Sequence, residues 1–169
     1  VFRIDKIRSM AYAPDGMTMI WSGVKDGQSD LYQYQVIGNN HTALWTDPYD
    51  DLDPIFSDDG QCIWFTSNRP NAQLNRPFVL GEPLRSYHDV FQLLWTEDIP
   101  QLIHWIDTPE RDERFPQVQP EEHVAFLVET SSGQQERWIS WRDSAVAYID
   151  TAIHYRFYTE ERLAERLEL

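Results

Sequence analysis

The 169-residue sequence has little cysteine, few basic residues and no long apolar run. Its single cysteine, Cys62, excludes an intramolecular disulfide, and the apolar residues around it favour a buried small side chain over a reactive thiol. Lys and Arg number 14 against 28 Asp and Glu, which argues against a nucleic-acid-binding face and against contact with anionic membranes. Without a run of about 18 apolar residues, no segment is predicted to span a membrane.

Patterns typical of catalytic, cofactor and metal sites are also missing. There is no Gly-x-Ser-x-Gly elbow, and the 5 histidines lack the spacing of zinc ligands. His88 beside Asp89 could form half of a catalytic dyad, but a histidine at a loop end is favoured, because neighbours in sequence rarely have the geometry of a dyad. We therefore expect no enzyme activity, no catalytic residue, no cofactor and no metal.

What the sequence does contain is a repeated pattern. Ser9–Ser22 and Asp53–Arg69 each hold an apolar run, a tight Asp-Gly turn and a second apolar run. Asp15 aligns with Asp59 at a displacement of 44 residues (59 − 15), which is the period of a four-stranded propeller blade. The turn suits a hairpin, because Gly accepts a positive φ and Asp bonds its own backbone.

A third copy, Phe115–Val128, keeps the apolar pattern but has Glu121 in place of the turn aspartate. In the first copy an alternating strand starts at Asp30, 15 residues after the turn (30 − 15). In the second copy the matching strand starts at Asp89, 30 residues after the turn (89 − 59). The additional length, 71–86, is rich in Pro, Asn and Arg and is predicted to be an inserted loop.

These patterns predict an all-β fold, a partial β-propeller of about three four-stranded blades over residues 1–158. Within it, 143–158 is expected to add two strands, although its apolar residues also fit a helical spacing. A short C-terminal helix is expected over 159–169. Since about 4–8 blades close a ring, the ring is expected to be open. The chain begins at Val1, so we expect a fragment or a processed chain.

Acidic residues gather in two predicted connecting segments. Asp47–Pro54 links the first two copies and could offer oxygen ligands to calcium. No Asp-x-Asp-x-Asp-Gly loop is complete there, and a solvated acidic turn is the alternative, so the calcium question stays open. The mixed-charge segment 109–115 is expected to be a solvated loop.

The two clear copies resemble the TolB-like propeller repeat of bacterial cell-envelope proteins. The resemblance is carried by Ala13-Pro14-Asp15-Gly16 with Asp30-Leu31-Tyr32, by Ser57-Asp58-Asp59-Gly60 with Asp89-Val90-Phe91, and by Ser67-Asn68-Arg69. Asp58 stands where the family has proline, and the third copy lacks the Asp-Gly turn. The resemblance implies a propeller, a habit of protein–protein interaction, and a periplasmic or cell-envelope location, with the cytoplasm as the alternative.

We interpret the chain as a non-catalytic scaffold or subunit of a bacterial envelope assembly, with other protein subunits as partners and no nucleic acid. The predicted contact surface is the inserted loop with its exit, namely Arg76, Phe78, Arg85 and Tyr87, because Arg and aromatic residues dominate interface hot spots. One alternative is the propeller part of a longer serine hydrolase or peptidase. Another is an open ring that a partner completes.

Overall fold

The structure is a computed structural model that describes residues 3–74, 84–95, 100–108, 110–120, 123–130 and 132–142. The strands expected in 143–158, the helix expected in 159–169 and most of the inserted loop lie outside the described residues. No helix in the described part of the chain combines the length and apolarity needed to cross a bilayer.

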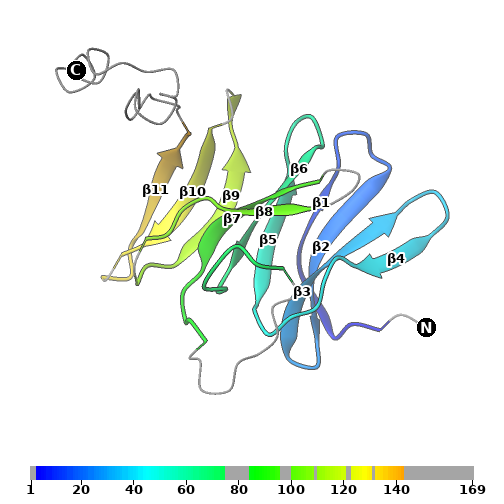
Figure 1. Cartoon of the computed structure of the whole chain (residues 1–169), viewed down its shortest axis with the longest axis horizontal. Coiled ribbons are helices and arrows are strands. Elements are labelled where there is room, and N and C mark those ends of the chain that lie inside the picture. Colours follow the sequence, from blue (N-terminus) through cyan, green and yellow to red (C-terminus); the bar gives the residue numbers. More distant parts are fainter. Residues whose placement is uncertain are drawn as a thin grey trace, which may run out of the picture.

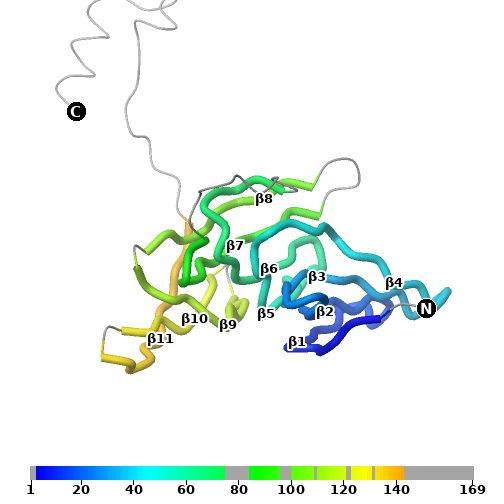
Figure 2. The backbone as a smooth tube through the Cα atoms, turned by 90° about the horizontal axis from the view of Figure 1, so that it is seen from below, coloured from blue at the N-terminus to red at the C-terminus, as the bar shows by residue number. Residues whose placement is uncertain are grey.

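Three antiparallel sheets stand side by side in chain order (Figures 1 and 2). Blade 1 consists of β1 (Lys6–Tyr12), β2 (Thr18–Lys25), β3 (Gln28–Gln35) and β4 (Asn40–Ala43). Blade 2 consists of β5 (Asp51–Phe56), β6 (Cys62–Ser67), β7 (Asp89–Leu94) and β8 (Gln101–His104). Blade 3 has three strands in the described residues, β9 (Glu113–Val118), β10 (Val124–Glu129) and β11 (Gln135–Ser140). The predicted all-β, partial-propeller class is confirmed.

The two Asp-Gly turns form as their chemistry dictates. Gly16 and Gly60 adopt φ values of 68° and 73°. The Asp15 Oδ1 accepts a hydrogen bond from the Met17 amide at 2.8 Å, and the Asp59 Oδ1 accepts one from the Gln61 amide at 3.0 Å. Because the carboxylate replaces a backbone acceptor at the same place in both copies, β1–β2 and β5–β6 are equivalent hairpins.

The core lies between the blades. One cluster joins blades 1 and 2 and consists of Ile20, Leu31, Trp45, Ile63, Phe65, Phe91 and Leu93. A second joins blades 2 and 3 and consists of Trp64, Val90, Val124, Phe126 and Val128. Successive residues of a strand point to opposite faces, so Trp64 enters the second cluster while its neighbours enter the first. Blade 2 is therefore buried on both faces.

The same hydrogen bond recurs at both junctions between blades. The Asp50 Oδ1 accepts a hydrogen bond from the Ser29 amide at 2.9 Å, just before Asp30. The Asp112 Oδ1 accepts one from the His88 amide at 2.8 Å, just before Asp89. Blade 3 thus joins blade 2 as blade 2 joins blade 1, which agrees with the alignment of the third, diverged copy.

Candidate functional site

The two ends of the propeller differ in what they carry. The Asp-Gly turns lie at one end, where they line a cleft of about 230 Å³ between blades 1 and 2. Because the strands are antiparallel, the β4–β5 and β8–β9 links and the loop between β6 and β7 lie at the other end. We call this second end the loop end. It holds two clusters of buried charge and the described part of the predicted contact surface.

The first cluster surrounds Arg69. Its guanidinium donates to both carboxylate oxygens of Asp51, at 2.7 and 2.8 Å, and to the Asp47 Oδ2 at 3.2 Å. The indole of Trp45 also donates to Asp51, at 2.6 Å. Burial would lower the pKa of Arg69, but these two carboxylates raise it above its ordinary value. Arg69 and Asp51 are both fully buried, so they form a charged core at the blade junction.

This arrangement corrects the expectation of a solvated acidic turn. Asp51 and Asp53 are buried, and Asp53 forms an ion pair with Arg114 at 2.7 Å. Asp50 accepts from Ser29, as described above. Each of these carboxylates, like that of Asp47, accepts hydrogen bonds from donors of the protein.

The segment 109–115 is also not simply solvated. The Glu113 side chain is fully buried, where it accepts hydrogen bonds from the Thr108 hydroxyl and, at 3.2 Å, from the Val90 amide. Burial raises the pKa of Glu113 to about 7, and the nearby charge of Asp89 adds to the effect. The expectation failed because a strand, β9, begins at Glu113 and carries it into the blade junction.

Asp30 is the second buried acid of the first junction. Burial raises its pKa to about 7, and the carboxylates of Asp51 and Asp47 contribute to the rise. Its Oδ1 has no hydrogen-bond partner among the described residues. Asp30 therefore stays protonated in the folded chain up to a pH at which it is ionised in the unfolded chain.

Asp30→Asn is expected to stabilise the protein above pH 7 by on the order of 2 kcal/mol, with little change near pH 4. A raised carboxyl pKa weakens the folded state as pH rises from about 4 to 7, and asparagine removes that loss. Urea unfolding at pH 4.5 and 8 measures the effect. Asp58→Asn, the same change at an exposed position, should shift stability by less than about 0.5 kcal/mol. Equal shifts for Asp30→Asn at both pH values would contradict the assignment.

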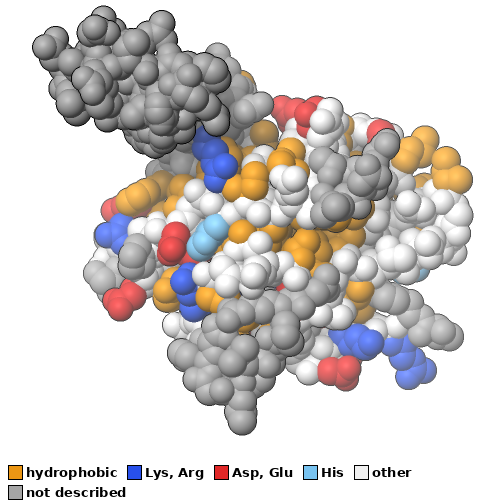
Figure 3. Space-filling view, in the orientation of Figure 1, with side chains coloured by type: hydrophobic (Ala, Val, Ile, Leu, Met, Phe, Trp, Pro, Cys, Tyr) orange, Lys and Arg blue, Asp and Glu red, His pale blue; other side chains and the backbone are white. Residues whose placement is uncertain are grey.

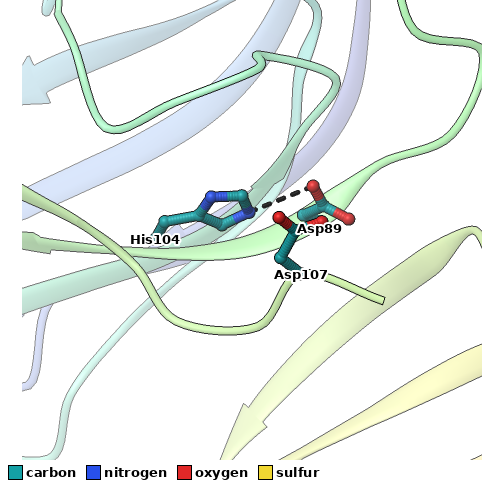
Figure 4. A group of neighbouring side chains, drawn as sticks. All are labelled: Asp89, His104 and Asp107. Atoms are coloured by element: carbon teal, nitrogen blue, oxygen red, sulfur yellow. Dashed lines mark hydrogen bonds and ion pairs between the residues drawn. The ribbon is translucent and has the colours of Figure 1, made fainter. Parts of the chain in front are cut away.

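The second cluster lies at the junction of blades 2 and 3. Asp89 begins β7, His104 ends β8, and Asp107 lies in the β8–β9 link, so that the imidazole and the two carboxyl groups point toward one another (Figure 4). The His104 Nε2 lies 3.0 Å from the Asp89 Oδ2. Arg85 places Nη1 2.7 Å from the same oxygen and 3.8 Å from the Asp107 Oδ1. Burial raises the pKa of Asp89, although His104 and Arg85 oppose the rise.

His88 and Asp89 do not form a dyad with each other. The His88 Nδ1 lies 2.7 Å from the Asp112 Oδ1, whereas Asp89 contacts His104 and Arg85. Side chains alternate along an extended strand, so these two neighbours diverge. The pairing of Asp89 with His104 was missed in the sequence, because the two residues meet only through the pairing of β7 with β8.

The described part of the predicted contact surface lies beside this cluster. Arg76 and Phe78 are outside the described residues. The Arg85 guanidinium lies 5.3 Å from the centre of the Tyr87 ring, so these two predicted residues are neighbours. Tyr87 lines a groove of about 760 Å³ between blades 2 and 3. The other residues lining the groove are Ser86, Glu110, Arg111, Asp112, Glu129 and Thr130.

The surface combines apolar and charged regions. On the face seen in Figure 3, hydrophobic side chains gather over the middle of the molecule, and charged side chains of both signs are spread around them. Leu84, at the exit of the inserted loop, is 52% exposed. The loop end therefore offers an aromatic residue, an arginine and an exposed leucine next to a polar groove.

Comparisons with known proteins give a fold. No family model and no curated protein matches the sequence. A candidate TolB protein from Agrobacterium tumefaciens matches 75% of this chain with a TM-score of 0.57 and 18% identity, and TolB from Acinetobacter baumannii matches 77% with a TM-score of 0.55 and 13% identity. The AtxE2 isopeptidase in its apo form covers 78% with a TM-score of only 0.40 and 14% identity.

The chain corresponds to only part of these larger structures. It spans 40% of the Agrobacterium protein and 28% of the Acinetobacter protein. At such low identity the likeness concerns the path of the backbone and not the chemistry of a site. The arrangement of blades that the repeat pattern predicted is thus found in both solved proteins, and the chain has a TolB-like propeller fold.

Proposed function

We propose that the chain is a non-catalytic interaction module of the bacterial cell envelope that binds another protein subunit through its loop end. The observation that carries the proposal is that Arg85 lies against the ring of Tyr87, which lines the groove between blades 2 and 3. Loops on a rigid sheet scaffold are common binding elements, and an arginine stacked on an aromatic ring is typical of an interface hot spot.

The charge of the chain supports a basic partner segment. The net charge is −14, and the groove is lined by Glu110, Asp112 and Glu129 against a single arginine, Arg111. Arg111 lies against the ring of Trp138, 5.5 Å from its centre. A positively charged partner would be attracted to this end of the molecule, and its association would weaken as salt is added.

The test compares affinities for a partner identified by co-purification from bacterial envelope extracts. Tyr87→Ala and Phe78→Ala are each expected to weaken binding about tenfold or more, since truncation of a hot-spot aromatic costs at least 1–2 kcal/mol. Biolayer interferometry at two salt concentrations gives both the loss and the electrostatic contribution.

Tyr12→Ala is the matched control, because Tyr12 is 61% exposed on β1, away from the loop end. It should leave the affinity unchanged. If the partner bound Tyr87→Ala and Phe78→Ala as tightly as the unaltered chain, or if native mass spectrometry found only a lone monomer in envelope extracts, the proposal would fail. Labelling of the native protein by a fluorophosphonate probe would instead favour the hydrolase alternative.

A further inference from the structure

We propose that Asp89, His104 and Asp107 form a binding site for a divalent transition-metal ion such as Zn²⁺, and that Arg85 competes with the ion for this site. The three residues each offer one ligand atom, and these atoms lie within 4.8 Å of one another (Figure 4). One imidazole and two carboxylates form a donor set that suits zinc, whose sites commonly leave a further position to water. The inference goes beyond the proposed interaction function and does not depend on it.

The distances fit a shared ion. Zinc ligands lie at about 2.0–2.2 Å from the metal, so two tetrahedral ligand atoms are separated by roughly 3.3 Å. The His104 Nε2 and the Asp89 Oδ2 are already 3.0 Å apart. The imidazole is held in place by stacking on Phe91, with 4.3 Å between ring centres and 10° between planes. Little rearrangement of these two residues is therefore needed.

A second observation concerns the other oxygen of Asp89. The Asp89 side chain is fully buried, yet its Oδ1 has no hydrogen-bond partner among the described residues. A buried carboxylate oxygen without a partner is costly, and an ion bound by both oxygens of Asp89 would give Oδ1 a partner and remove that cost. Asp107, whose side chain is 55% exposed, gives the group an opening to solvent.

Arg85 currently supplies the positive charge. Its Nη1 lies 2.7 Å from the Asp89 Oδ2 and 3.8 Å from the Asp107 Oδ1, so the guanidinium lies beside the oxygens that would bind the ion. The Arg85 side chain is 23% exposed whereas that of Asp89 is fully buried, so the arginine can turn toward solvent while Asp89 stays in place. Metal binding would release Arg85, and removal of Arg85 would favour the metal.

The experiment titrates the purified full chain with Zn²⁺ against a chromogenic chelator. One ion per chain is expected, and Arg85→Ala should bind it about tenfold more tightly than the unaltered protein. His104→Ala should weaken binding at least about tenfold. His123→Ala is the matched control, since His123 lines a different groove, near the Asp59 turn, and should bind as the unaltered chain does.

Two further measurements keep the test decisive. If His104→Ala does not fold, His104→Gln is used in its place, because glutamine retains a hydrogen-bond donor toward Asp89. The visible absorption spectrum with Co²⁺ and the NMR shifts of the His104 ring report coordination directly. The proposed site would be wrong if neither the unaltered chain nor Arg85→Ala bound one ion per chain. It would also be wrong if the His104 variants bound Zn²⁺ as tightly as the unaltered chain. Equal affinities with and without Arg85 would overturn the competition.

Discussion

Replacing Arg69 with methionine is expected to destabilise the protein by about 3–5 kcal/mol, a large part of the stability of a single domain. Methionine fills similar space, so the loss comes from charge. Without the guanidinium, Asp51 and Asp47 lose their shared cation inside the blade junction, and Asp30 lies near them. Urea unfolding followed by circular dichroism gives the change in the free energy of unfolding.

The matched control is Arg137→Met on β11, where the arginine is exposed and a change within about 0.5 kcal/mol is expected. Part of the stability lost in Arg69→Met should be recovered at pH 5, because the carboxylates that no longer have an arginine partner can take up protons there. Part of the lost stability should also be recovered in the double variant Arg69→Met/Asp51→Asn. An unfolding midpoint like that of the unaltered protein would show that the pair contributes nothing to the junction.

The hairpins could be predicted because their determinants are local. Asp15 and Asp59 each accept a hydrogen bond from an amide two residues away, and the following glycine supplies the required φ. Neighbouring residues therefore determine the turn. The third hairpin lacks this turn, and its prediction rests on its apolar pattern and on the spacing of 15 residues from Glu121 to Glu136, the same as from Asp15 to Asp30. The structure bears it out, since β9 and β10 pair and the Gln119 amide donates to the His123 carbonyl at 2.8 Å.

The charged core could not be predicted in the same way. Asp51 meets Arg69 across 18 residues, and Asp53 meets Arg114 across 61. These contacts between residues far apart in sequence depend on strand register and on the packing of one blade against the next. A local sequence pattern specifies neither. The sequence did contain one indication of buried acids, namely that aspartates occupy equivalent positions in the first two copies. Asp30 and Asp89 begin equivalent stretches of their blades, yet the sequence alone did not show that both are buried.

Each junction places buried acidic side chains near one another, and different groups reduce their repulsion at each junction. At the first junction Asp30 takes the raised pKa, and Arg69 neutralises Asp51. At the second junction burial raises the pKa of both Glu113 and Asp89, and Arg85 and His104 oppose the rise at Asp89. The two junctions thus share their backbone geometry but differ in the charged side chains that they contain. Within the part of the chain that the structure describes, this difference places an imidazole beside two carboxylates at the second junction and not at the first.

Phe91→Ala is expected to cost about 3–5 kcal/mol and to unfold blades 1 and 2 together. Phe91 is fully buried in β7, stacks on Phe65 with 5.9 Å between ring centres, and belongs to the cluster that includes Ile20 and Leu31 of blade 1. A cavity there removes contacts from both sheets of the cluster that joins blades 1 and 2. Thermal unfolding followed by circular dichroism, together with hydrogen exchange of the β2 and β6 amides, measures the effect.

Phe115→Ala makes the same chemical change at a position that is 47% exposed on β9, and its cost should stay below about 1 kcal/mol. The comparison separates the loss of an aromatic ring from the loss of packing. If β2 kept its exchange protection in Phe91→Ala while β6 lost it, blade 1 would be stable by itself. The shared cluster would then not couple the blades. Equal loss at both strands is the expected result, because Ile20 and Leu31 of blade 1 belong to the same buried cluster as Phe65 and Phe91 of blade 2.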